Sequence, residues 1–224
     1  MNSETFSRIK YSDKKWSKLS KPEIVRIKKA VALISNGKNV LDVGAYNGNI
    51  SKLIKEQGNS VSATDAADRF LKNFSDAGIE FRKSDLEKEL PFRSSSFDVV
   101  FAGEVIEHLV DTDNFLDEIF RVLKKDGFLV LTTPNIASAA RRLLLLLGKN
   151  PHLEVSYEFP SKIVAGHLRY FTFNLLEKFL EYHKFTVEVR MSDVVNLTNN
   201  LSSEFLANMF PTLGRSIIVK ATKK

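Results

Sequence analysis

Residues 39–49 read Asn-Val-Leu-Asp-Val-Gly-Ala-Tyr-Asn-Gly-Asn, and this stretch decides the fold. Residues 40–43 form a short, mainly apolar run that suits a buried β-strand. Gly44 and Gly48 then open a tight turn, and apolar residues follow at helical spacing. The order strand, glycine turn, helix places a ligand against free N–H groups at a helix start. Taken alone, a Gly-x-x-x-Gly turn also fits a plain strand–helix connection.

Length and composition limit the class of protein. The chain has 224 residues, 43% of them hydrophobic, which is enough for one sizeable core and most simply for one domain. It has no cysteine, so disulfides, thiolate metal sites and cysteine nucleophiles are excluded. Residues 1–20 contain no apolar leader segment, and no apolar run is long enough to span a bilayer. We therefore expect a soluble, cytoplasmic protein.

The formal net charge is +6 and the pI is about 9.4. A basic chain can bind nucleic acid or an anionic membrane surface, or it can simply have a solvated basic surface. The lysines are spread widely, and part of the excess lies in the tail at 220–224. This distribution favours the solvated surface.

Strand-like and helix-like segments alternate along most of the chain. The expected strands are 40–43, 60–64, 79–83, 97–102, 128–132, 185–191 and 215–221. The expected helices are 21–35, a helix starting near residue 50, 68–77, 111–124, 135–147, 172–183 and 203–210. The alternation predicts an α/β fold of the Rossmann-like type: a seven-stranded, mostly parallel sheet with helices on both faces and an antiparallel last strand.

Acidic or glycine residues follow four of these strands. They are Asp42 with Gly44, then Asp65, Asp85 with Leu86, and Gly103 with Glu104. An acidic residue after the second strand can accept from both hydroxyls of a ribose. An aspartate after the third can accept from an adenine amino group, with Leu86 against the ring. Each of these residues, taken alone, is more often a turn residue. Four such signals that follow successive strands, however, indicate a nucleoside ligand.

Together these blocks resemble the class I S-adenosylmethionine-dependent methyltransferases, and in particular small-molecule O-methyltransferases of the ubiquinone-pathway type. The matching stretches are Val-Leu-Asp-Val-Gly-x-x-x-Gly (40–48), Ser-Asp-Leu (84–86), Phe-Asp-Val-Val-Phe-Ala-Gly-Glu-Val-Ile-Glu-His-Leu (97–109), Phe-Arg-Val-Leu-Lys-Lys-Asp-Gly-Phe-Leu-Val-Leu-Thr-Thr-Pro-Asn (120–135) and Gly-His-Leu-Arg-Tyr-Phe-Thr (166–172). The resemblance covers roughly residues 36–221.

The resemblance implies S-adenosylmethionine as the cofactor. It places at the cofactor Asp42, Gly44, Tyr46, Gly48, Asp65, Ala66, Asp85, Leu86, Gly103 and Glu104. The methionine end would lie at the glycine turn, the ribose at Asp65, the adenine at Asp85 and the transferred methyl at Glu104. One departure stands out, because the family usually has a third glycine where this chain has Tyr46. A tyrosine there needs a backbone conformation that permits a side chain, and its ring is expected to face the cofactor or the N-terminal arm.

A second group of residues suggests a metal site. Glu104, Glu107 and His108 lie within about one helical turn, and His167 follows His108 by 59 residues (167 − 108). This set could hold Mg²⁺, Mn²⁺ or Zn²⁺. It resembles two metal-using groups, the ubiquinone-pathway O-methyltransferases and the small-RNA 3′-terminal 2′-O-methyltransferases. The alternative is that Glu107 and His108 form a helix cap or an acid–base pair without metal. We expect Glu107, His108 and His167 to be catalytic, with one histidine as general base.

Two segments fall outside the regular alternation. We expect residues 1–35 to be an arm and helix that help cover the substrate and cofactor, and residues 36–224 to be the methyltransferase domain. Residues 135–166 are expected to be a lid-like insertion over the acceptor. The two arginines and five successive leucines in residues 136–147 would touch an apolar substrate or a membrane surface. Alternatively, that helix packs on the domain or in a homodimer interface.

The leading functional prediction is methyl transfer from S-adenosylmethionine to a hydroxyl of a small or lipid-linked molecule. An RNA 2′-O-methyltransferase is the first alternative, supported by the charge and the Glu/His set, although 224 residues leave no room for an added basic RNA-binding domain. The second is a non-catalytic S-adenosylmethionine-binding partner subunit. A nicotinamide oxidoreductase fits poorly, since the turn at 44–48 lacks a full Gly-x-Gly-x-x-Gly.

Overall fold

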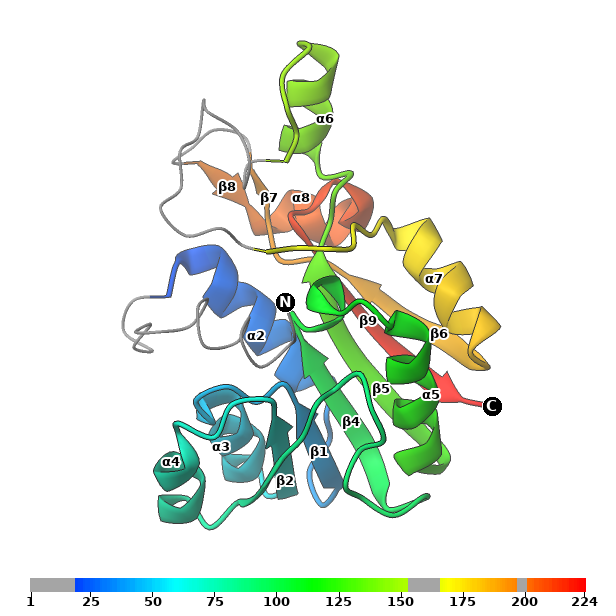
Figure 1. Cartoon of the computed structure of the whole chain (residues 1–224). Coiled ribbons are helices and arrows are strands. Elements are labelled where there is room, and N and C mark those ends of the chain that lie inside the picture. Colours follow the sequence, from blue (N-terminus) through cyan, green and yellow to red (C-terminus); the bar gives the residue numbers. More distant parts are fainter. Residues whose placement is uncertain (1–18, 153–165, 197–200) are drawn as a thin grey trace.

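The computed structural model describes residues 19–152, 166–196 and 201–224, and these form a central sheet with helices on both faces (Figure 1). The strands of the sheet are β1 (Asn39–Val43), β2 (Ser60–Asp65), β3 (Glu80–Lys83), β4 (Phe97–Gly103), β5 (Leu123–Pro134), β6 (Phe185–Met191) and β9 (Ser216–Lys223). The helices are α2 (Lys21–Ala32), α3 (Asn49–Glu56), α4 (Leu71–Asp76), α5 (Thr112–Val122), α6 (Ala139–Leu146), α7 (Phe173–Tyr182) and α8 (Glu204–Met209), with 3₁₀ turns η2 (Ile106–His108) and η4 (Pro211–Leu213).

The strands lie in the order β3-β2-β1-β4-β5-β9-β6. The chain runs outward from β1 to β3 and then returns to β4, which pairs in parallel with β1. In open α/β sheets, ligands bind at the carboxyl ends of the strands where the winding reverses. Here that place is between β1 and β4. The last strand, β9, is antiparallel to both β5 and β6, which confirms the predicted fold class.

The alternating side chains of the central strands build two separate cores. In β1, Leu41 and Val43 belong to the core under α5 and α7, whereas Val40 belongs to the core under α2, α3 and α4. Neighbouring strand residues point to opposite faces, so one strand supplies both layers. This two-sided burial explains why β1 and β4 are nearly continuous apolar runs.

Two boundaries differ from the prediction by four residues or more. The sequence predicts a helix up to residue 124 and a strand from residue 128, with a turn between them, but residues 125–127 lie inside β5, which begins at Leu123 and bends at Asp126, whose φ is 64°. The pairing with β4 shifts register there. The helix expected from Asn135 starts only at Ala139, because Asn135 pairs with Phe171 and its side chain donates to the carbonyls of Thr212 and Gly214.

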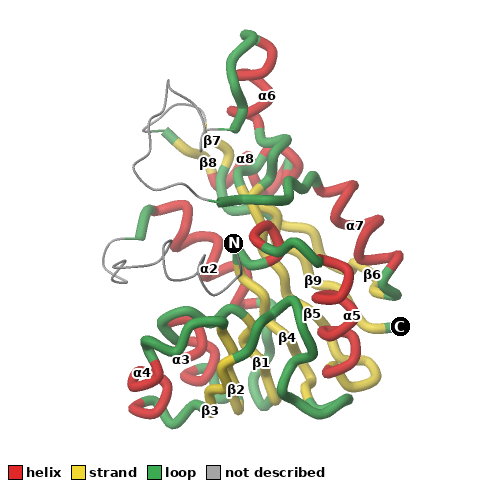
Figure 2. Tube along the Cα trace, in the orientation of Figure 1, coloured by secondary structure: helices red, strands yellow, loops and turns green. Residues whose placement is uncertain are grey.

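A small subdomain stands beyond the carboxyl end of the sheet. It contains α6, α8 and the two-stranded sheet of β7 (Val195–Asn196) and β8 (Ser202–Ser203), which the sequence did not predict (Figures 1 and 2). The polar connection expected at 196–200 lies mostly outside the described residues. Among the helices described, none has the length and apolar content to cross a membrane.

The start of the chain is described from residue 19, so the arm expected at residues 1–18 lies outside the described part, as does 153–165 of the lid. The helix that follows the arm is α2. The Glu23 side chain accepts from the backbone N and hydroxyl of Ser20 at 2.9 and 2.6 Å, a capping box that begins the helix. Ile27, Ala30 and Val31 are buried, and α2 packs on β5 and β9. The buried face of α2 therefore packs on the central sheet.

Candidate functional site

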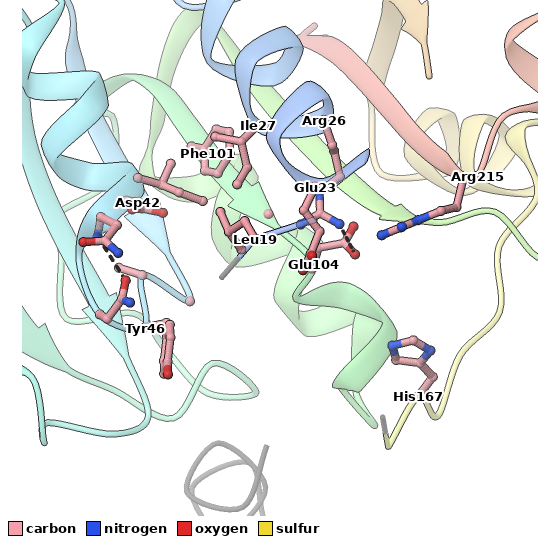
Figure 3. Close-up of a pocket in the computed structure, with 16 residues that line it drawn as sticks. Leu19, Glu23, Arg26, Ile27, Asp42, Tyr46, Phe101, Glu104, His167 and Arg215 are labelled. Carbon is pink, nitrogen blue, oxygen red and sulfur yellow. Dashed lines mark hydrogen bonds and ion pairs between the residues drawn. The ribbon is translucent and has the colours of Figure 1, made fainter. Parts of the chain in front are cut away.

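A cavity of about 270 Å³ opens at the carboxyl ends of β1 and β4, beneath α2 (Figure 3). Four parts of the chain line it: the start of α2, the turn after β1, the end of β4, and two residues from late in the sequence. Those two are His167 and Arg215. Figure 3 shows Asp42 and Tyr46 at one end of the cavity and His167 and Arg215 at the other. The cavity thus lies where the strand order predicts a ligand.

The glycine turn forms one end of the cavity. The backbone N–H groups of Gly44 and Ala45 both donate to the carbonyl of Thr64, at 2.8 and 3.1 Å, which ties the turn to β2. Gly44 has a φ of 73°, and a Cβ there would lie 2.4 Å from Val105 Cγ2. Only glycine combines this backbone conformation with so close a neighbour. Gly48, with a φ of 77°, is the N-cap residue of α3.

Tyr46 stands where the resemblance led us to expect a glycine, and its φ of 48° is in the left-handed region, which side chains rarely adopt. Its N–H donates to Asp65 Oδ2 at 2.9 Å. Its ring meets Phe70 edge to face at a centroid distance of 5.0 Å, and the Arg69 guanidinium lies over both rings. The polar bond and the aromatic contacts together hold the unfavourable backbone in place.

Asp65 ends β2 and is 6% exposed. Its second oxygen, Oδ1, accepts from the N–H of Ala67 at 2.9 Å. Burial raises the pKa of the Asp65 carboxyl, and the bonds from Ala67 and Tyr46 oppose that rise. The carboxylate is thereby held rigidly beside the glycine turn and Ala66, where the ribose is expected.

Asp85 and Leu86 follow β3 and lie apart from the cavity lining. Asp85 Oδ1 accepts from the N–H of Glu87 at 3.1 Å, and the carboxylate is 3.6 Å from Lys88 Nζ. Leu86 is 5% exposed and belongs to the core under α5. The two residues flank the turn after β3, and their assignment to the adenine stays a prediction.

Glu104 makes a contact that the sequence did not predict. Its carboxylate pairs with the Arg26 guanidinium of α2 at 2.6 Å, and it accepts from the Thr132 hydroxyl at 3.2 Å. Both side chains of the pair are mostly buried, at 12% exposed for Arg26 and 19% for Glu104. The backbone of Glu104 has a φ of 59°, so this residue is held in a strained conformation at the end of β4. The pair joins α2 to β4 across the middle of the cavity.

Glu107, His108 and His167 converge, as the sequence predicted. Each offers one ligand atom, and these atoms lie within 4.8 Å of one another. The His108 and His167 ring centroids are 4.9 Å apart, and His108 Nε2 is 3.7 Å from Glu107 Oε1. Glu107 is 1% exposed and accepts from the Thr133 hydroxyl at 3.0 Å. Glu104 is not part of this group, because its carboxylate lies on Arg26.

Backbone bonds explain why residues 59 positions apart meet. The carbonyl of Glu107 accepts from the N–H groups of Leu168 and Arg169, at 2.7 and 3.1 Å. The Arg169 guanidinium also donates to the carbonyl of Val110 at 2.6 Å, and the carbonyl of Gly166 lies 3.3 Å from His108 Nδ1. These contacts clamp the segment after Gly166 onto η2. His167 is therefore held beside His108 at the cavity wall.

The cavity lining divides the predicted site residues. Six of them line it: Asp42, Gly44, Tyr46, Gly103, Glu104 and His167. Seven lie behind or beside it: Gly48, Asp65, Ala66, Asp85, Leu86, Glu107 and His108. Sequence reasoning missed Arg26 and Arg215, because neither belongs to a recognisable motif and each comes from a segment far from the glycine turn.

Residues 41–131 match a family described as a methyltransferase domain. Among curated proteins, the chain is 35% identical over 109 residues to the mitochondrial ubiquinone biosynthesis O-methyltransferase of Bos taurus, covering 45% of this chain and 30% of that protein. It is 29% identical over 144 residues to the ubiquinone biosynthesis O-methyltransferase of Xylella fastidiosa, covering 58% of each. Residues 41–131 therefore form a methyltransferase domain, which is similar to the class I S-adenosylmethionine-dependent methyltransferases. The whole chain spans less than two thirds of the length of these relatives.

Solved structures share the fold of this chain. One is a methyltransferase of Thermotoga maritima described as a possible histamine N-methyltransferase, with a TM-score of 0.66, 18% identity and 89% of each chain covered. Another is the 1,6-didemethyltoxoflavin-N1-methyltransferase of Burkholderia thailandensis, with a TM-score of 0.63 and 16% identity, covering 93% of this chain and 80% of that one. At these identities the likeness concerns the fold alone.

Asp65→Ala should weaken the binding of S-adenosylmethionine by about 10- to 100-fold, because the variant loses the carboxylate that is expected to accept from the ribose hydroxyls and that anchors the Tyr46 N–H. Calorimetric titration measures the change. Asp68→Ala is the matched control, since Asp68 lies in the same loop and pairs with Lys83 at 3.5 Å. Unchanged affinity in Asp65→Ala would remove Asp65 from the cofactor site.

The buried carboxyl of Asp42 should make the stability of the protein depend on pH. Burial raises the pKa of its carboxyl to about 7 from 3.8, although the Ser51 hydroxyl donates to it at 2.5 Å. Between these two values the folded chain keeps a proton that the unfolded chain releases, so stability falls as the pH rises from about 4 to 7. At pH values above this range, the folded protein should be about 4 kcal/mol less stable than at pH values below it.

Asp42→Asn, which cannot ionise, should therefore stabilise the ligand-free protein by about 3 kcal/mol more at pH 8 than at pH 4.5. Urea unfolding of both proteins at the two pH values measures this. A difference between variant and wild type that is the same at both pH values would contradict the buried, protonated carboxyl.

Proposed function

We propose that the chain transfers the methyl group of S-adenosylmethionine to a hydroxyl oxygen of a small or lipid-linked acceptor. The observation that carries the proposal is a single cavity with the glycine turn at one end and His167 at the other. The first end suits the methionine part of the cofactor, and the second offers an imidazole to an acceptor. Relatives that are named O-methyltransferases support oxygen as the acceptor atom.

In this reaction the acceptor oxygen bonds to the methyl carbon as the carbon–sulfur bond breaks. The electron pair stays on sulfur, which leaves in the neutral thioether S-adenosylhomocysteine. The acceptor proton passes to the imidazole of His108 or His167, as in general base catalysis. Because the attack must be in line, the walls of the cavity contribute by holding both reactants in position.

The cluster of Glu107, His108 and His167 also fits a divalent cation. Two imidazoles and one carboxylate form a donor set found in catalytic zinc sites, and carboxylates also suit Mg²⁺ and Mn²⁺. A cation bound there would supply Lewis acidity toward the acceptor hydroxyl. The Glu107 carboxylate is held for this role by the Thr133 hydroxyl at 3.0 Å. Glu104, expected as a fourth ligand, is engaged by Arg26, so we propose the three-residue set.

Exposed apolar side chains support an apolar or lipid-linked acceptor. Leu145, Leu146 and Leu147 are at least 61% exposed on and after α6, which stands apart from the sheet (Figure 2). We therefore keep a peripheral membrane contact of residues 136–147 as a proposal, with a homodimer as the other use of this face. The membrane contact would not depend on Arg142, because its guanidinium donates to the carbonyls of Ala137 and Thr212.

Incubation of cell extract with S-adenosylmethionine that carries a labelled methyl group tests the proposal. The lipid, small-molecule and RNA fractions are then separated and the labelled product is identified by mass spectrometry. Label on an oxygen in the first two fractions supports the proposal, whereas label in RNA favours an RNA 2′-O-methyltransferase. Cofactor binding without any labelled product favours a non-catalytic partner subunit.

A further inference from the structure

Arg215 lines the cavity at the end opposite the glycine turn, and no motif accounts for it. It lies directly before β9, whose first residue pairs with the last residue of β5. The strand order β1-β4-β5-β9 puts β9 three strands away from β1. At about 4.8 Å per strand, that is roughly 14 Å from the turn that holds the methionine end. Arg215 therefore belongs to the acceptor end of the cavity.

The backbone of Arg215 is held on both sides. Its N–H donates to the carbonyl of Val194 and its carbonyl accepts from the N–H of Asn135, each at 2.9 Å. The preceding Gly214 accepts from the Asn135 side chain at 2.9 Å. A residue anchored in this way presents its side chain to the cavity at a defined place, and Figure 3 shows the guanidinium extending toward the Arg26–Glu104 pair. Such anchoring reduces the entropy that a ligand contact would cost.

The guanidinium has hydrogen-bonding capacity left for a ligand. Its carboxylate neighbour is Asp193, whose Oδ2 lies 3.7 Å from Arg215 Nε. Asp193 is fully buried and already accepts from the N–H and hydroxyl of Ser216, at 2.9 and 3.1 Å. Arg215 has five N–H donors, and among the described residues none accepts a hydrogen bond from them. The side chain is 36% exposed, so these donors face the cavity and its solvent.

Among the described residues that line the cavity, Arg215 is the guanidinium with donors left for an acceptor. Arg26 is paired with Glu104 at 2.6 Å, and Glu23 is engaged by Ser20 at the start of α2. The planar guanidinium fork matches a carboxylate or phosphate in two parallel hydrogen bonds. His167 stands at the same end of the cavity as Arg215. If Arg215 binds the anionic group of the acceptor, the rest of the acceptor lies beside the His167 imidazole.

We propose that Arg215 binds an anionic oxygen group of the acceptor, a carboxylate or a phosphate, and so selects acidic hydroxyl compounds as substrates. This inference rests on the proposed methyl transfer to oxygen. It makes Arg215 a specificity-determining residue at the end of the cavity away from the cofactor.

The test is calorimetric titration of the full chain saturated with S-adenosylhomocysteine. The probes are 4-hydroxybenzoate with its neutral amide, and 4-hydroxyphenyl phosphate with hydroquinone. Wild type should bind at least one charged probe about 10- to 100-fold more tightly than its neutral partner. Arg215→Gln should lose most of this preference, and Arg215→Lys, which keeps the charge without the fork, should retain part of it.

Arg190→Gln is the matched control, because it removes the same charge from an exposed arginine on β6 that pairs with Glu177. It should keep the wild-type preference. The inference is overturned if no charged probe is preferred over its neutral partner, or if the preference survives in Arg215→Gln. A loss of S-adenosylhomocysteine affinity in Arg215→Gln would also overturn it, since Arg215 would then hold the cofactor. Wild type that fails to bind S-adenosylhomocysteine at all would instead contradict the proposed function.

Discussion

His167→Ala is expected to lower methyl transfer by about 100- to 10,000-fold, the range that a positioned general base or its equivalent contributes. His167 lines the acceptor end of the cavity, and its ring centroid lies 4.9 Å from that of His108. The glycine turn and Asp65 remain intact in the variant, so its affinity for S-adenosylhomocysteine should not change. Turnover of labelled S-adenosylmethionine with an accepted substrate, and calorimetric titration, measure the two effects.

A chelator tests whether turnover also depends on a divalent cation. If Glu107, His108 and His167 hold a divalent ion, dialysis against a chelator will reduce wild-type turnover as strongly as His167→Ala does. Mg²⁺, Mn²⁺ or Zn²⁺ should restore wild type but not the variant. His183→Gln is the control for loss of an imidazole, because His183 lies 2.8 Å from Asp117 on α5, away from the cavity. Full activity in chelator would exclude the cation and leave His108 as a base or a cap.

Gly44→Ala should destabilise the fold by about 2–5 kcal/mol and abolish measurable cofactor binding. The variant puts a side chain on a residue with a φ of 73°, which costs about 1–2 kcal/mol, and its Cβ would lie 2.4 Å from Val105 Cγ2, an overlap that costs about 1–3 kcal/mol more. Because the turn is tied to Thr64 through the N–H groups of Gly44 and Ala45, relief of the overlap would distort the cofactor site. Urea unfolding and calorimetric titration measure both losses.

Two further variants separate the causes of this loss. Gly37 has nearly the same φ, 72°, but a Cβ there would meet nothing within 4 Å, so Gly37→Ala should show the backbone cost alone. Val105→Ala removes the methyl groups that the Cβ introduced by Gly44→Ala would strike, and combining the two substitutions should recover part of the stability beyond additivity. If Gly44→Ala and Gly37→Ala destabilise equally, close packing against Val105 is not the reason for this glycine.

The fold was predictable because its signals are local. The period-2 and period-3.6 apolar patterns report which residues are buried, and burial on both sides marks β1 and β4 as central strands of a parallel sheet. The glycine turn at 44–48 and the acidic residues at the strand ends lie within a few residues of the elements that position them. The antiparallel last strand was also predicted, whereas the order of the strands in the sheet came from the structure.

The ends of the helices and strands were less predictable from the sequence, because contacts with distant residues help to set them. The helix expected from Asn135 begins at Ala139, because Asn135 is used to anchor Phe171, Thr212 and Gly214. The turn expected at residues 125–127 is part of β5, whose pairing with β4 includes Leu123, skips the next four residues and resumes at Phe128. In both places the contacts of the folded chain override the local conformational preference of the segment.

By itself, the sequence determined the class of fold and predicted the grouping of Glu107, His108 and His167, and it gave a prediction for the cofactor end of the site. Motif spacing and the alternation of strands and helices are enough for these. Only the tertiary structure decided how the acceptor end is built. There Arg26 of α2 reaches Glu104, the carbonyl of Glu107 captures the segment that carries His167, and Asn135 and Val194 hold Arg215. These contacts join segments between about 20 and 80 residues apart, and a pattern of apolar residues carries no record of which polar partner a distant side chain will meet.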